Sequence, residues 1–364
     1  MLRAMAMAVR AARNAEGNTF PNPLVGAVLV RDGNVIGVGA HLRAGECHAE
    51  INAIRGANDA RGATLYVTLE PCAHEGRQPP CVLEIIRSRI SRVVVGALDP
   101  NPITGGRGVE MLRDAGIEVS VLNDPAALAL IRDFRIWING NRPYVSLKMA
   151  SSIDGYVASN QGERLCLTGA AWKKYVHQLR YTHQAVLVGS GTVLVDDPHL
   201  TIDRRKRSVP FRRVIVAGRA PINPMAKIFG PEKGYLPTVV LFPESEKHSS
   251  WIASLAKVGE VLPCPDKDGR LSLAEALRLL RSSFGIVSVL CEGGPLLAKT
   301  LLFEDLVETI FWAQAPRLLS SPRSVATIFP DSGDLSYLKF GLSGVKRLKG
   351  DVASEYWRCR SERV

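Results

Sequence analysis

The sequence predicts an α/β protein with two domains. Its 364 residues exceed the usual size of a single domain. Short runs of apolar and β-branched residues alternate with segments of helical periodicity, a pattern typical of sheets covered by helices. The stretch Gly140-Asn141-Arg142-Pro143 interrupts this alternation with residues that break helices. We therefore expect one α/β domain over residues 1–142 and a second over residues 143–364.

The first domain is expected to be a three-layer unit rich in βαβ repeats. Apolar residues from Leu2 to Ala12 recur at helical spacing, which predicts an amphipathic first helix. Pro71 is predicted to begin a helix because a first-turn residue needs no amide donor, and Cys72 would then lie at a helix N-terminus. The predicted helices span 2–14, 48–54, 106–115 and 124–139, a loop and a helix together span 71–88, and the predicted strands span 24–30, 35–41, 63–70, 92–98 and 117–122.

The second domain is expected to form an α/β sheet with helices on both faces. It begins with a strand at Tyr144, directly after the break, and a polar loop at 154–162 leads into a helix. The predicted strands span 144–149, 185–188, 214–216, 238–241 and 286–290, the predicted helices span 170–182 and 296–302, and closing antiparallel strands are expected at 306–314 and near 345–358.

The most informative motif is His48-Ala49-Glu50, followed by Pro71-Cys72 and then by Cys81. Imidazole and thiolate are zinc ligands, and three protein ligands leave the fourth tetrahedral position open to water, as in catalytic sites. Zinc lowers the pKa of such a water, and Glu50 can carry its proton to a leaving amine. This division of labour is typical of zinc-dependent nucleobase deamination. The sequence therefore predicts zinc held by His48, Cys72 and Cys81, with Glu50 as the catalytic acid–base group.

Two other residues compete for the metal. Eight residues separate Cys72 from Cys81, whereas nucleobase deaminases usually have two, and His74 lies in this interval. Cys47 adjoins His48, but neighbouring residues point in different directions. If His74 or Cys47 closed the site, the zinc would be structural and the domain would be a zinc-stabilised binding module.

Glycine-rich turns indicate a cofactor site in the second domain. Gly293-Gly294-Pro295 follows a predicted strand and precedes a predicted helix, so the backbone can approach a pyrophosphate there. A turn at residues 189–192 follows another strand, and such turns at the ends of one open sheet form a cofactor crevice. Asp196 and Asp197, before Pro198, form a pair of acids that is equally typical of a simple turn.

The net charge of +11 raises the question of a nucleic-acid partner. Much of the charge is local, and a run of this kind is either a solvated loop or a docking surface for phosphorylated small molecules. The basic run lacks the interleaved aromatic side chains that single-strand binders use to stack bases. We therefore expect no nucleic-acid partner. The clustered residues are Arg204, Arg205, Lys206, Arg207, Arg212 and Arg213.

Cysteine usage and hydropathy bear on the compartment. The seven cysteines are an odd number, two of them are assigned to metal, and no secretory signal is evident. No apolar run approaches the length of a membrane span. We expect a cytoplasmic protein without a membrane partner.

Longer motifs resemble one known family. Residues 68–81, together with 21–26 and 99–102, closely resemble the deaminase half of the bifunctional deaminase/reductase family of riboflavin biosynthesis. Residues 147–155, 191–198 and 292–295 look like its reductase half. The resemblance covers nearly the whole chain in the family's order. It implies a cytidine-deaminase-like three-layer α/β/α domain followed by a dihydrofolate-reductase-like α/β domain.

The resemblance also implies roles for individual residues. Lys148 looks like the residue that faces the reacting sugar carbon, and Asp196 matches a catalytic and cofactor-contacting position. Asn22 and Asn101 are candidates to read the polar edge of the pyrimidine, although asparagine is also a common turn residue. His41 either closes the pocket or is an ordinary core histidine. The remaining cofactor positions are Ala150, Cys166, Thr192, Gly294, Pro295 and Leu296, and the remaining substrate positions are Arg164, Arg180, Leu200, Arg204 and Glu292.

Several residues depart from the family pattern in the second half. Arg164 stands where the family has a phosphate-binding serine, and arginine also binds phosphate. Cys166 replaces a tryptophan that packs on the cofactor and cannot supply the same stacking area. Asp203 precedes Arg204 where the family has its arginine. An Asp-Ser pair is replaced by Ala217-Gly218, which leaves Arg219 or the basic cluster to hold the 2′-phosphate of NADPH.

The resemblance thus implies a two-step enzyme of riboflavin biosynthesis that uses zinc and NADPH. It would deaminate 2,5-diamino-6-ribosylamino-4(3H)-pyrimidinone 5′-phosphate and then reduce the ribosyl side chain to ribityl. The rival hypotheses are a monofunctional deaminase with a degenerate reductase domain and a tRNA or nucleobase deaminase with an unrelated second domain. A homodimer or a higher homo-oligomer is the expected oligomeric state.

Overall fold

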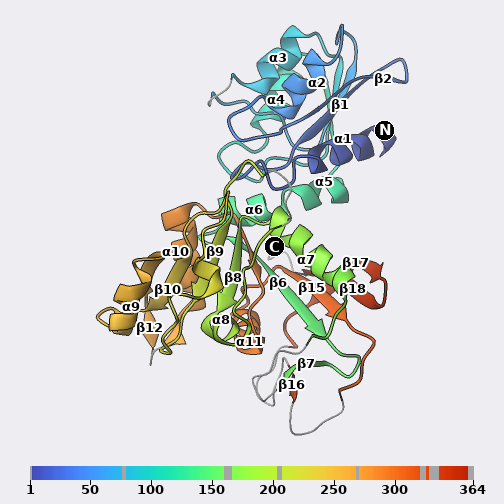
Figure 1. Cartoon of the computed structure of the whole chain (residues 1–364). Coiled ribbons are helices and arrows are strands. Elements are labelled where there is room, and N and C mark those ends of the chain that lie inside the picture. Colours follow the sequence, from blue (N-terminus) through green and yellow to red (C-terminus); the bar gives the residue numbers. More distant parts are fainter. Residues whose placement is uncertain are drawn as a thin grey trace. The chain divides into compact units, whose positions relative to one another are not determined.

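The chain forms two compact units, Met1–Asn141 and Arg142–Val364, in the computed structural model (Figure 1). The structure describes residues 2–75, 79–159, 166–202, 207–267, 270–319, 325–327 and 336–359. Each unit has its own sheet and its own apolar core. The positions Arg164, Asp203 and Arg204, expected to matter in the second unit, lie outside the described residues.

The first unit contains a five-stranded sheet in the order β2-β1-β3-β4-β5. β1 is antiparallel to both β2 and β3, and β3, β4 and β5 run parallel. Side chains that follow β3 and β4 therefore leave the sheet at the same edge. The strands are β1 (Gly26–Arg31), β2 (Asn34–Ala40), β3 (Thr64–Val67), β4 (Arg92–Val95) and β5 (Glu118–Val121).

Helices cover both faces of this sheet. Apolar residues of α2, α3 and α4 pack with one face of the strands, and those of α1 and α5 pack with the other. The predicted three-layer α/β/α architecture is therefore confirmed. The helices are α1 (Leu2–Arg13), α2 (Ala49–Arg55), α3 (Cys81–Arg87), α4 (Arg107–Asp114), α5 (Pro125–Leu130) and α6 (Arg132–Asn139).

Two glycines allow helices to lie directly on the strands. A Cβ atom on Gly26 would come within 2.0 Å of the carbonyl oxygen of Ala8 in α1. A Cβ atom on Gly39 would come within 2.2 Å of the carbonyl oxygen of Ala49 at the start of α2. Only glycine permits this approach of backbones. Gly39 thus sets the depth at which the first turn of α2 lies against the sheet.

The second unit is built around a nine-stranded sheet in the order β11-β10-β9-β8-β14-β6-β15-β18-β17. The strands from β11 to β15 are parallel, and β18 and β17 are antiparallel at one edge. The strands of this sheet are β6 (Tyr144–Ser151), β8 (Ala185–Gly189), β9 (Arg212–Val216), β10 (Val239–Pro243), β11 (Glu260–Cys264), β14 (Ser288–Cys291), β15 (Thr309–Gln314), β17 (Phe340–Leu348) and β18 (Asp351–Arg358).

Helices again pack on both faces, as predicted. α10 and α11 share a core with one face of the strands, and α7, α8 and α9 pack with the other. The remaining elements are short. The helices are α7 (Ala170–Thr182), α8 (Ser190–Asp196), α9 (Ser250–Leu255), α10 (Leu273–Phe284), α11 (Pro295–Phe303) and the 3-10 turns η1 (Lys227–Phe229) and η2 (Glu244–Glu246), and the small strands are β7 (Tyr156–Ser159), β12 (Asp266–Lys267), β13 (Arg270–Leu271) and β16 (Val325–Thr327).

The expected helix start at Pro71 and Cys72 is wrong. Pro71 and Cys72 lie in a loop, and α3 begins only at Cys81, with Pro80 as its extended N-cap. Proline disfavours the helical conformation in the residue before it, so Pro79 and Pro80 prevent a helix from running through this segment. Cys81, rather than Cys72, therefore lies at a helix start.

Other differences concern element boundaries. Residues 190–196 form α8 rather than the expected glycine turn, because Val193 packs into the core beside Val186 and Val188. The expected helix over 124–139 is two helices that meet at Ile131, whose backbone is not helical. The polar loop at 154–162 contains β7. The tail near 345–358 is a hairpin of β17 and β18, and β15 is parallel to β6 although it is antiparallel to β18.

Candidate active sites

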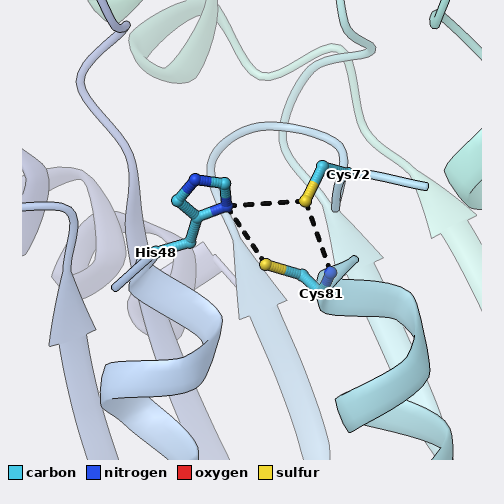
Figure 2. Close-up of side chains that lie close together, drawn as sticks. All are labelled: His48, Cys72 and Cys81. Carbon is cyan, nitrogen blue, oxygen red and sulfur yellow. Dashed lines mark hydrogen bonds between the residues drawn. The ribbon is translucent and has the colours of Figure 1, made fainter. Parts of the chain in front are cut away.

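Three predicted zinc ligands meet at the edge of the first sheet (Figure 2). His48 is the N-cap residue of α2, and Cys81 is the first residue of α3. Cys72 follows β3 in a loop. Two ligands thus come from helix starts and one from a loop, as expected, although the two cysteines exchange these positions.

The geometry of the three side chains fits a zinc ion. His48 Nδ1 lies 3.2 Å from Cys81 Sγ and 3.5 Å from Cys72 Sγ. Ligands of one tetrahedral zinc, with bonds of about 2.0 and 2.3 Å, lie about 3.5 Å apart. A hydrogen bond from Cys81 lowers the pKa of the Cys72 thiol, which favours the thiolate that binds metal.

Neither rival ligand joins this cluster. His74 is exposed, and the Cys47 thiol accepts a hydrogen bond from Arg55 Nη1 at 3.1 Å. Within the described ranges, the three ligand atoms belong to His48, Cys72 and Cys81. Among these residues, neither His74 nor Cys47 would therefore complete a four-ligand structural site. His48, Cys72 and Cys81 would hold zinc as three protein ligands, the number typical of catalytic sites.

Glu50 lies beside the three ligands in the first turn of α2. Its side chain is buried, and burial raises its pKa to about 7. In the part of the chain that the structure describes, its Oε2 atom has no hydrogen-bond partner. A buried carboxylate with a pKa near neutrality and an unused oxygen is suited to accept and release a proton.

His41 and Asn22 form a pair next to the metal ligands. The amide nitrogen of Asn22 lies 3.0 Å from His41 Nε2, and His41 Nδ1 lies 3.2 Å from the Cys47 carbonyl oxygen. Since a carbonyl only accepts, Nδ1 donates and Nε2 accepts from Asn22. The His41 ring also lies edge-on to that of His48, with centroids 5.3 Å apart. His41 is a satisfied buried histidine, yet it contacts the site and orients the Asn22 amide.

The other predicted asparagine lies in a turn that follows β4. Asn101 Oδ1 accepts a hydrogen bond from the Ile103 amide at 3.0 Å, as turn asparagines commonly do. The turn leaves the same edge of the sheet as the Cys72 loop.

Glu70 was missed by sequence reasoning. Its buried carboxylate accepts hydrogen bonds from the backbone amides of Asp99, Gly106 and Val109, at 2.9–3.1 Å. It thereby satisfies amides at the N-terminus of α4, where a negative charge is favoured. Because Glu70 is two residues from Cys72, it joins the metal-ligand loop to the loop of Asn101. The only signal in the sequence was an acidic residue at the end of an apolar strand.

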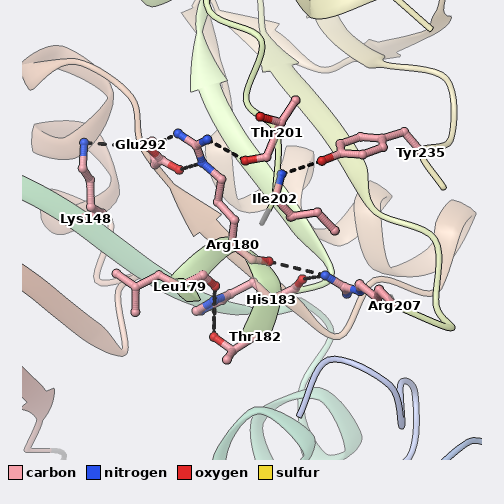
Figure 3. A network of polar contacts seen from close by, with 10 residues as sticks. All are labelled: Lys148, Leu179, Arg180, Thr182, His183, Thr201, Ile202, Arg207, Tyr235 and Glu292. Carbon is pink, nitrogen blue, oxygen red and sulfur yellow. Dashed lines mark hydrogen bonds and ion pairs between the residues drawn. The ribbon is translucent and has the colours of Figure 1, made fainter. Parts of the chain in front are cut away.

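The second site is a buried ion-pair network (Figure 3). Glu292, at the end of β14, accepts two hydrogen bonds from Arg180 of α7, one of them from Nη2 at 2.9 Å. Lys148 of β6 lies 3.8 Å from the same carboxylate. Burial opposes ionisation of Glu292, but the charges of Arg180 and Lys148 lower its pKa. The structure thus brings together three predicted site residues that are far apart in the sequence.

The expected cofactor turns also meet. β8 and β14 are neighbours, so Thr192 in α8 and Gly294 before α11 leave the same sheet edge. A Cβ atom on Gly294 would lie 3.8 Å from Thr192 Oγ1, and one on Gly191 would meet nothing within 4 Å. This open, glycine-lined edge at a helix start fits a dinucleotide pyrophosphate.

The other predicted cofactor positions are distributed around this edge. Ala150 of β6 packs with the α7 side of the core, and Pro295 and Leu296 begin α11, where Leu296 is exposed. Asp196 ends α8, and Asp197, in a left-handed conformation, pairs with Lys227 rather than closing a simple turn. Cys166 is exposed, and its carbonyl oxygen accepts a hydrogen bond from Arg317.

The described part of the basic cluster is neither a solvated loop nor a free docking surface. Arg207 donates to the carbonyl oxygens of Tyr181 and His183 at the end of α7. Arg212 pairs with Glu260 at 2.8 Å, and Arg213 donates to the Gly230 carbonyl oxygen at 2.8 Å. These three guanidinium groups stabilise the fold. Arg204, Arg205 and Lys206 lie outside the described residues.

Comparison with known proteins finds a matching family model for each unit. The family model "Cytidine and deoxycytidylate deaminase zinc-binding region" matches residues 2–97, and "RibD C-terminal domain" matches residues 143–354. The riboflavin biosynthesis protein RibD of Aquifex aeolicus is 40% identical over 89% of this chain and 89% of its own length. The chain belongs to the RibD family. The RibD protein of Escherichia coli is 36% identical over 87% of this chain and 88% of its own.

Solved RibD-family structures have the same fold. RibD of Acinetobacter baumannii superimposes with a TM-score of 0.85 at 34% identity, and each chain is covered to 98%. A deaminase/reductase from Thermotoga maritima gives a TM-score of 0.80 at 34% identity and the same coverage. The predicted cytidine-deaminase-like and reductase folds are confirmed. So are the enzyme class, a bifunctional deaminase and reductase of riboflavin biosynthesis, and its cofactors, zinc and NADPH.

Proposed function

We propose that this RibD-family chain catalyses two successive reactions on a phosphorylated pyrimidine. Residues 1–142 would remove the amino group from 2,5-diamino-6-ribosylamino-4(3H)-pyrimidinone 5′-phosphate by hydrolysis. Residues 143–364 would then reduce the ribosyl side chain to ribityl. The observation that supports this most directly is the convergence of His48, Cys72 and Cys81 beside the buried carboxylate of Glu50.

In the deaminase unit, each residue has one task. His48, Cys72 and Cys81 would hold zinc, which supplies Lewis-acid activation of water when bound. Glu50 takes a proton from the attacking water and delivers it to the departing amine, so that water adds at the ring carbon and ammonia leaves. Asn22, oriented by His41, and Asn101 would bind the polar edge of the ring.

In the reductase unit, Arg180, Leu200 and Glu292 would bind the phosphorylated substrate, and Lys148 would face the sugar carbon that is reduced. NADPH supplies the hydride when bound. Asp196, at the sheet edge, is proposed as a second titratable group of this site. We further propose cofactor contacts from Ala150, Cys166, Thr192, Gly294, Pro295 and Leu296, and substrate contacts from Arg164 and Arg204.

Mass analysis of the products tests both activities together. The purified chain, loaded with zinc, is incubated with the diaminopyrimidine ribosyl phosphate with and without NADPH. We expect the deaminated ribosyl compound without NADPH and the ribityl compound with it. Deamination without any reduction would indicate that the reductase unit is degenerate. The absence of both products would contradict the whole proposal.

We also propose that the enzyme is a cytoplasmic homodimer. All seven cysteines lie among the described residues and are free thiols, as in a reducing compartment. No helix of the described chain is long and apolar enough to cross a membrane. β17 ends the order of the nine-stranded sheet, and Leu342 and Val345 on it are exposed, which suits pairing with a second copy. Light scattering of the purified chain measures the oligomeric state, and a monomer would contradict the dimer.

A further inference from the structure

The segment between α8 and β9 contains a strained stretch of backbone next to the second site. Asp197 and Leu200 have φ values of 39° and 51°, in the left-handed region that side chains other than glycine rarely adopt. Leu200 is also buried. Such a conformation persists only where its surroundings hold it.

Side chains from other parts of the unit hold the backbone on both sides of Leu200. Arg180 Nη1 of α7 donates to the Thr201 carbonyl oxygen at 2.8 Å (Figure 3). The Ile202 amide donates to the hydroxyl oxygen of Tyr235 at 2.5 Å. Arg213 of β9 contributes a longer contact to the His199 carbonyl oxygen at 3.4 Å. The peptide unit between Thr201 and Ile202 is therefore held at its carbonyl oxygen by Arg180 and at its amide by the Tyr235 hydroxyl.

The Tyr235 ring is itself fixed. It meets the ring of Phe211 edge-on, with centroids 5.4 Å apart, and the Arg213 guanidinium lies 5.1 Å from its centroid. Backbone hydrogen bonds also join Phe211 to Gly234 and to Leu236 on either side of the tyrosine. The hydroxyl position is thus set by packing that does not depend on the hydrogen bond to Ile202.

A second chain of contacts joins the same aromatic pair to Arg180. The Arg207 guanidinium lies 5.4 Å from the Phe211 ring and donates to the carbonyl oxygens of Tyr181 and His183, at 3.1 and 2.7 Å. It thereby anchors the end of the helix that carries Arg180. Arg180 and the Thr201–Ile202 backbone are therefore both positioned by contacts with the Phe211 and Tyr235 side chains.

We propose that Tyr235 is a positioning residue of the reductase site. Its hydroxyl fixes the Leu200–Ile202 backbone, so that Arg180 remains aligned with Glu292 and with the phosphorylated ribosyl substrate. This inference rests on the proposed function, because it assigns Arg180, Leu200 and Glu292 to substrate binding. Tyr235 does not touch the reacting atoms and acts only through these residues.

The substitution Tyr235→Phe tests the proposal, because it removes the hydroxyl and keeps the ring. We expect the KM for the deaminated ribosyl intermediate to rise about 5- to 10-fold, the usual effect of losing one hydrogen bond. We expect kcat and the KM for NADPH to stay within about two-fold, since neither depends on the position of the Leu200–Ile202 backbone. Tyr337→Phe is the matched control. It removes a hydroxyl that donates to the Phe303 carbonyl oxygen at 3.0 Å in the same unit, and it should leave all three constants unchanged.

Hydrogen exchange gives a readout that is independent of catalysis. In Tyr235→Phe the amide of Ile202 should exchange at least about ten-fold faster, whereas the amide of Val214 in β9 should be unaffected. Calorimetric titration with the ribityl product should show the same 5- to 10-fold loss of affinity, and it applies even if the wild-type chain reduces nothing. Unchanged exchange at Ile202, or faster exchange with unchanged substrate KM and product affinity, would overturn the role of Tyr235. A wild-type chain without reduction would count against the proposed function alone.

Discussion

Glu50 combines deep burial, a pKa raised to about 7 and a position in the first turn of α2, directly after the predicted metal ligand His48 and its neighbour Ala49. A carboxylate usually ionises well below neutral pH, and it then transfers a proton poorly in the reverse direction. Burial, assisted by the nearby Cys72 thiolate, brings the pKa of Glu50 closer to neutrality. In the proposed proton transfer, the protein environment around α2 is therefore as important as the carboxylate itself.

Replacement of this carboxylate tests that role. Glu50→Gln with zinc retained should slow ammonia release by about 10²–10⁴, the usual contribution of a general acid–base group. Zinc content, measured by elemental analysis, should not change. The exposed Glu46→Gln is the control and should deaminate at the wild-type rate. A rate for Glu50→Gln near that of the control would remove Glu50 from the mechanism.

Glu70 gives a second prediction for a single residue. Glu70→Gln keeps the size of the side chain but replaces one acceptor oxygen with a donor, which faces backbone amides that also donate. Leaving such buried donors unpaired should reduce the free energy of unfolding by about 1–3 kcal/mol.

Denaturant unfolding measures this difference. The exposed Glu110→Gln in α4 is the control and should change the free energy of unfolding by less than about 1 kcal/mol. Equal stability of the two variants would mean that the carboxylate does not join the two loops.

Sequence reasoning reached some of these residues and missed others for a physical reason. His48, Glu50, Cys72 and Cys81 are recognisable because metal chemistry restricts the residue types and places them within 34 positions. Arg180 and Glu292 are 112 positions apart, and only resemblance to a family brought them together. Glu70 and Tyr235 act through backbone amides. Because almost every residue type has a backbone amide, the sequence of the partner segment does not reveal these contacts.

At the level of secondary structure, the position of α2 depends on how closely it approaches β2. The sequence reveals both elements, but it does not reveal the separation between them, which depends on Gly39. The incorrect helix start predicted at Cys72 came from a local signal in the sequence. The proline at position 71 suits a helix start, and only the later pair of prolines shows that the helix must wait until Cys81.

Gly39→Ala should displace α2 from the sheet. The added methyl group would lie 2.2 Å from the Ala49 carbonyl oxygen and 2.3 Å from the Ala53 nitrogen, and both are backbone atoms that cannot rotate away. We expect a loss of stability of about 1–3 kcal/mol and weaker zinc binding, because His48 caps the displaced helix.

Zinc affinity by competition with a chelating dye and stability by denaturant titration are the measurements. Gly56→Ala is the control, since its Cβ atom would have only ordinary contacts and its φ is −76°. If Gly39→Ala bound zinc like the control, the close approach would not determine the metal site.

The contact between β6 and α7 predicts a dependence of stability on pH. His183 Nδ1 donates to the Leu179 carbonyl oxygen at 2.7 Å, and Nε2 accepts from the Ser146 hydroxyl at 2.8 Å. Burial lowers the pKa of His183 from 6.5 to about 4. Between these two values the unfolded chain binds a proton that the folded chain does not, so stability falls as the pH decreases through this window.

The expected loss between about pH 7 and about pH 5 is on the order of 2 kcal/mol from this group. Denaturant titration at the two pH values measures it. His183→Gln should lose this part of the pH dependence, whereas the exposed His248→Gln should retain it. An identical pH dependence in both variants would show that His183 is not the responsible group.

For the whole molecule, the two sites depend on separate sheets and separate cores. The three proposed metal ligands all belong to the first unit, and Lys148, Arg180 and Glu292 all belong to the second. The sequence predicted this division because its periodicity restarts after a helix-breaking segment.

Removal of the metal should therefore separate the activities. After chelation, ammonia release should be lost, while NADPH oxidation with the supplied deaminated intermediate should stay within about two-fold of the untreated enzyme. Added zinc should restore ammonia release. Loss of both activities on chelation, with both restored by zinc, would show that the second unit also needs the ion.

The strand order of the larger sheet has a consequence for biosynthesis on the ribosome. β6 is the first strand of its unit, yet its two neighbours are β14 and β15, which end at Cys291 and Gln314. All strands of the first unit, in contrast, are complete by Val121. Because a domain emerging N-terminal first can fold during translation, the deaminase unit can form early, whereas β6 stays without either neighbour until most of the polypeptide has been made. The newly made chain thus carries an apolar, unpaired strand for much of its synthesis, and this is the period in which chaperone protection matters most.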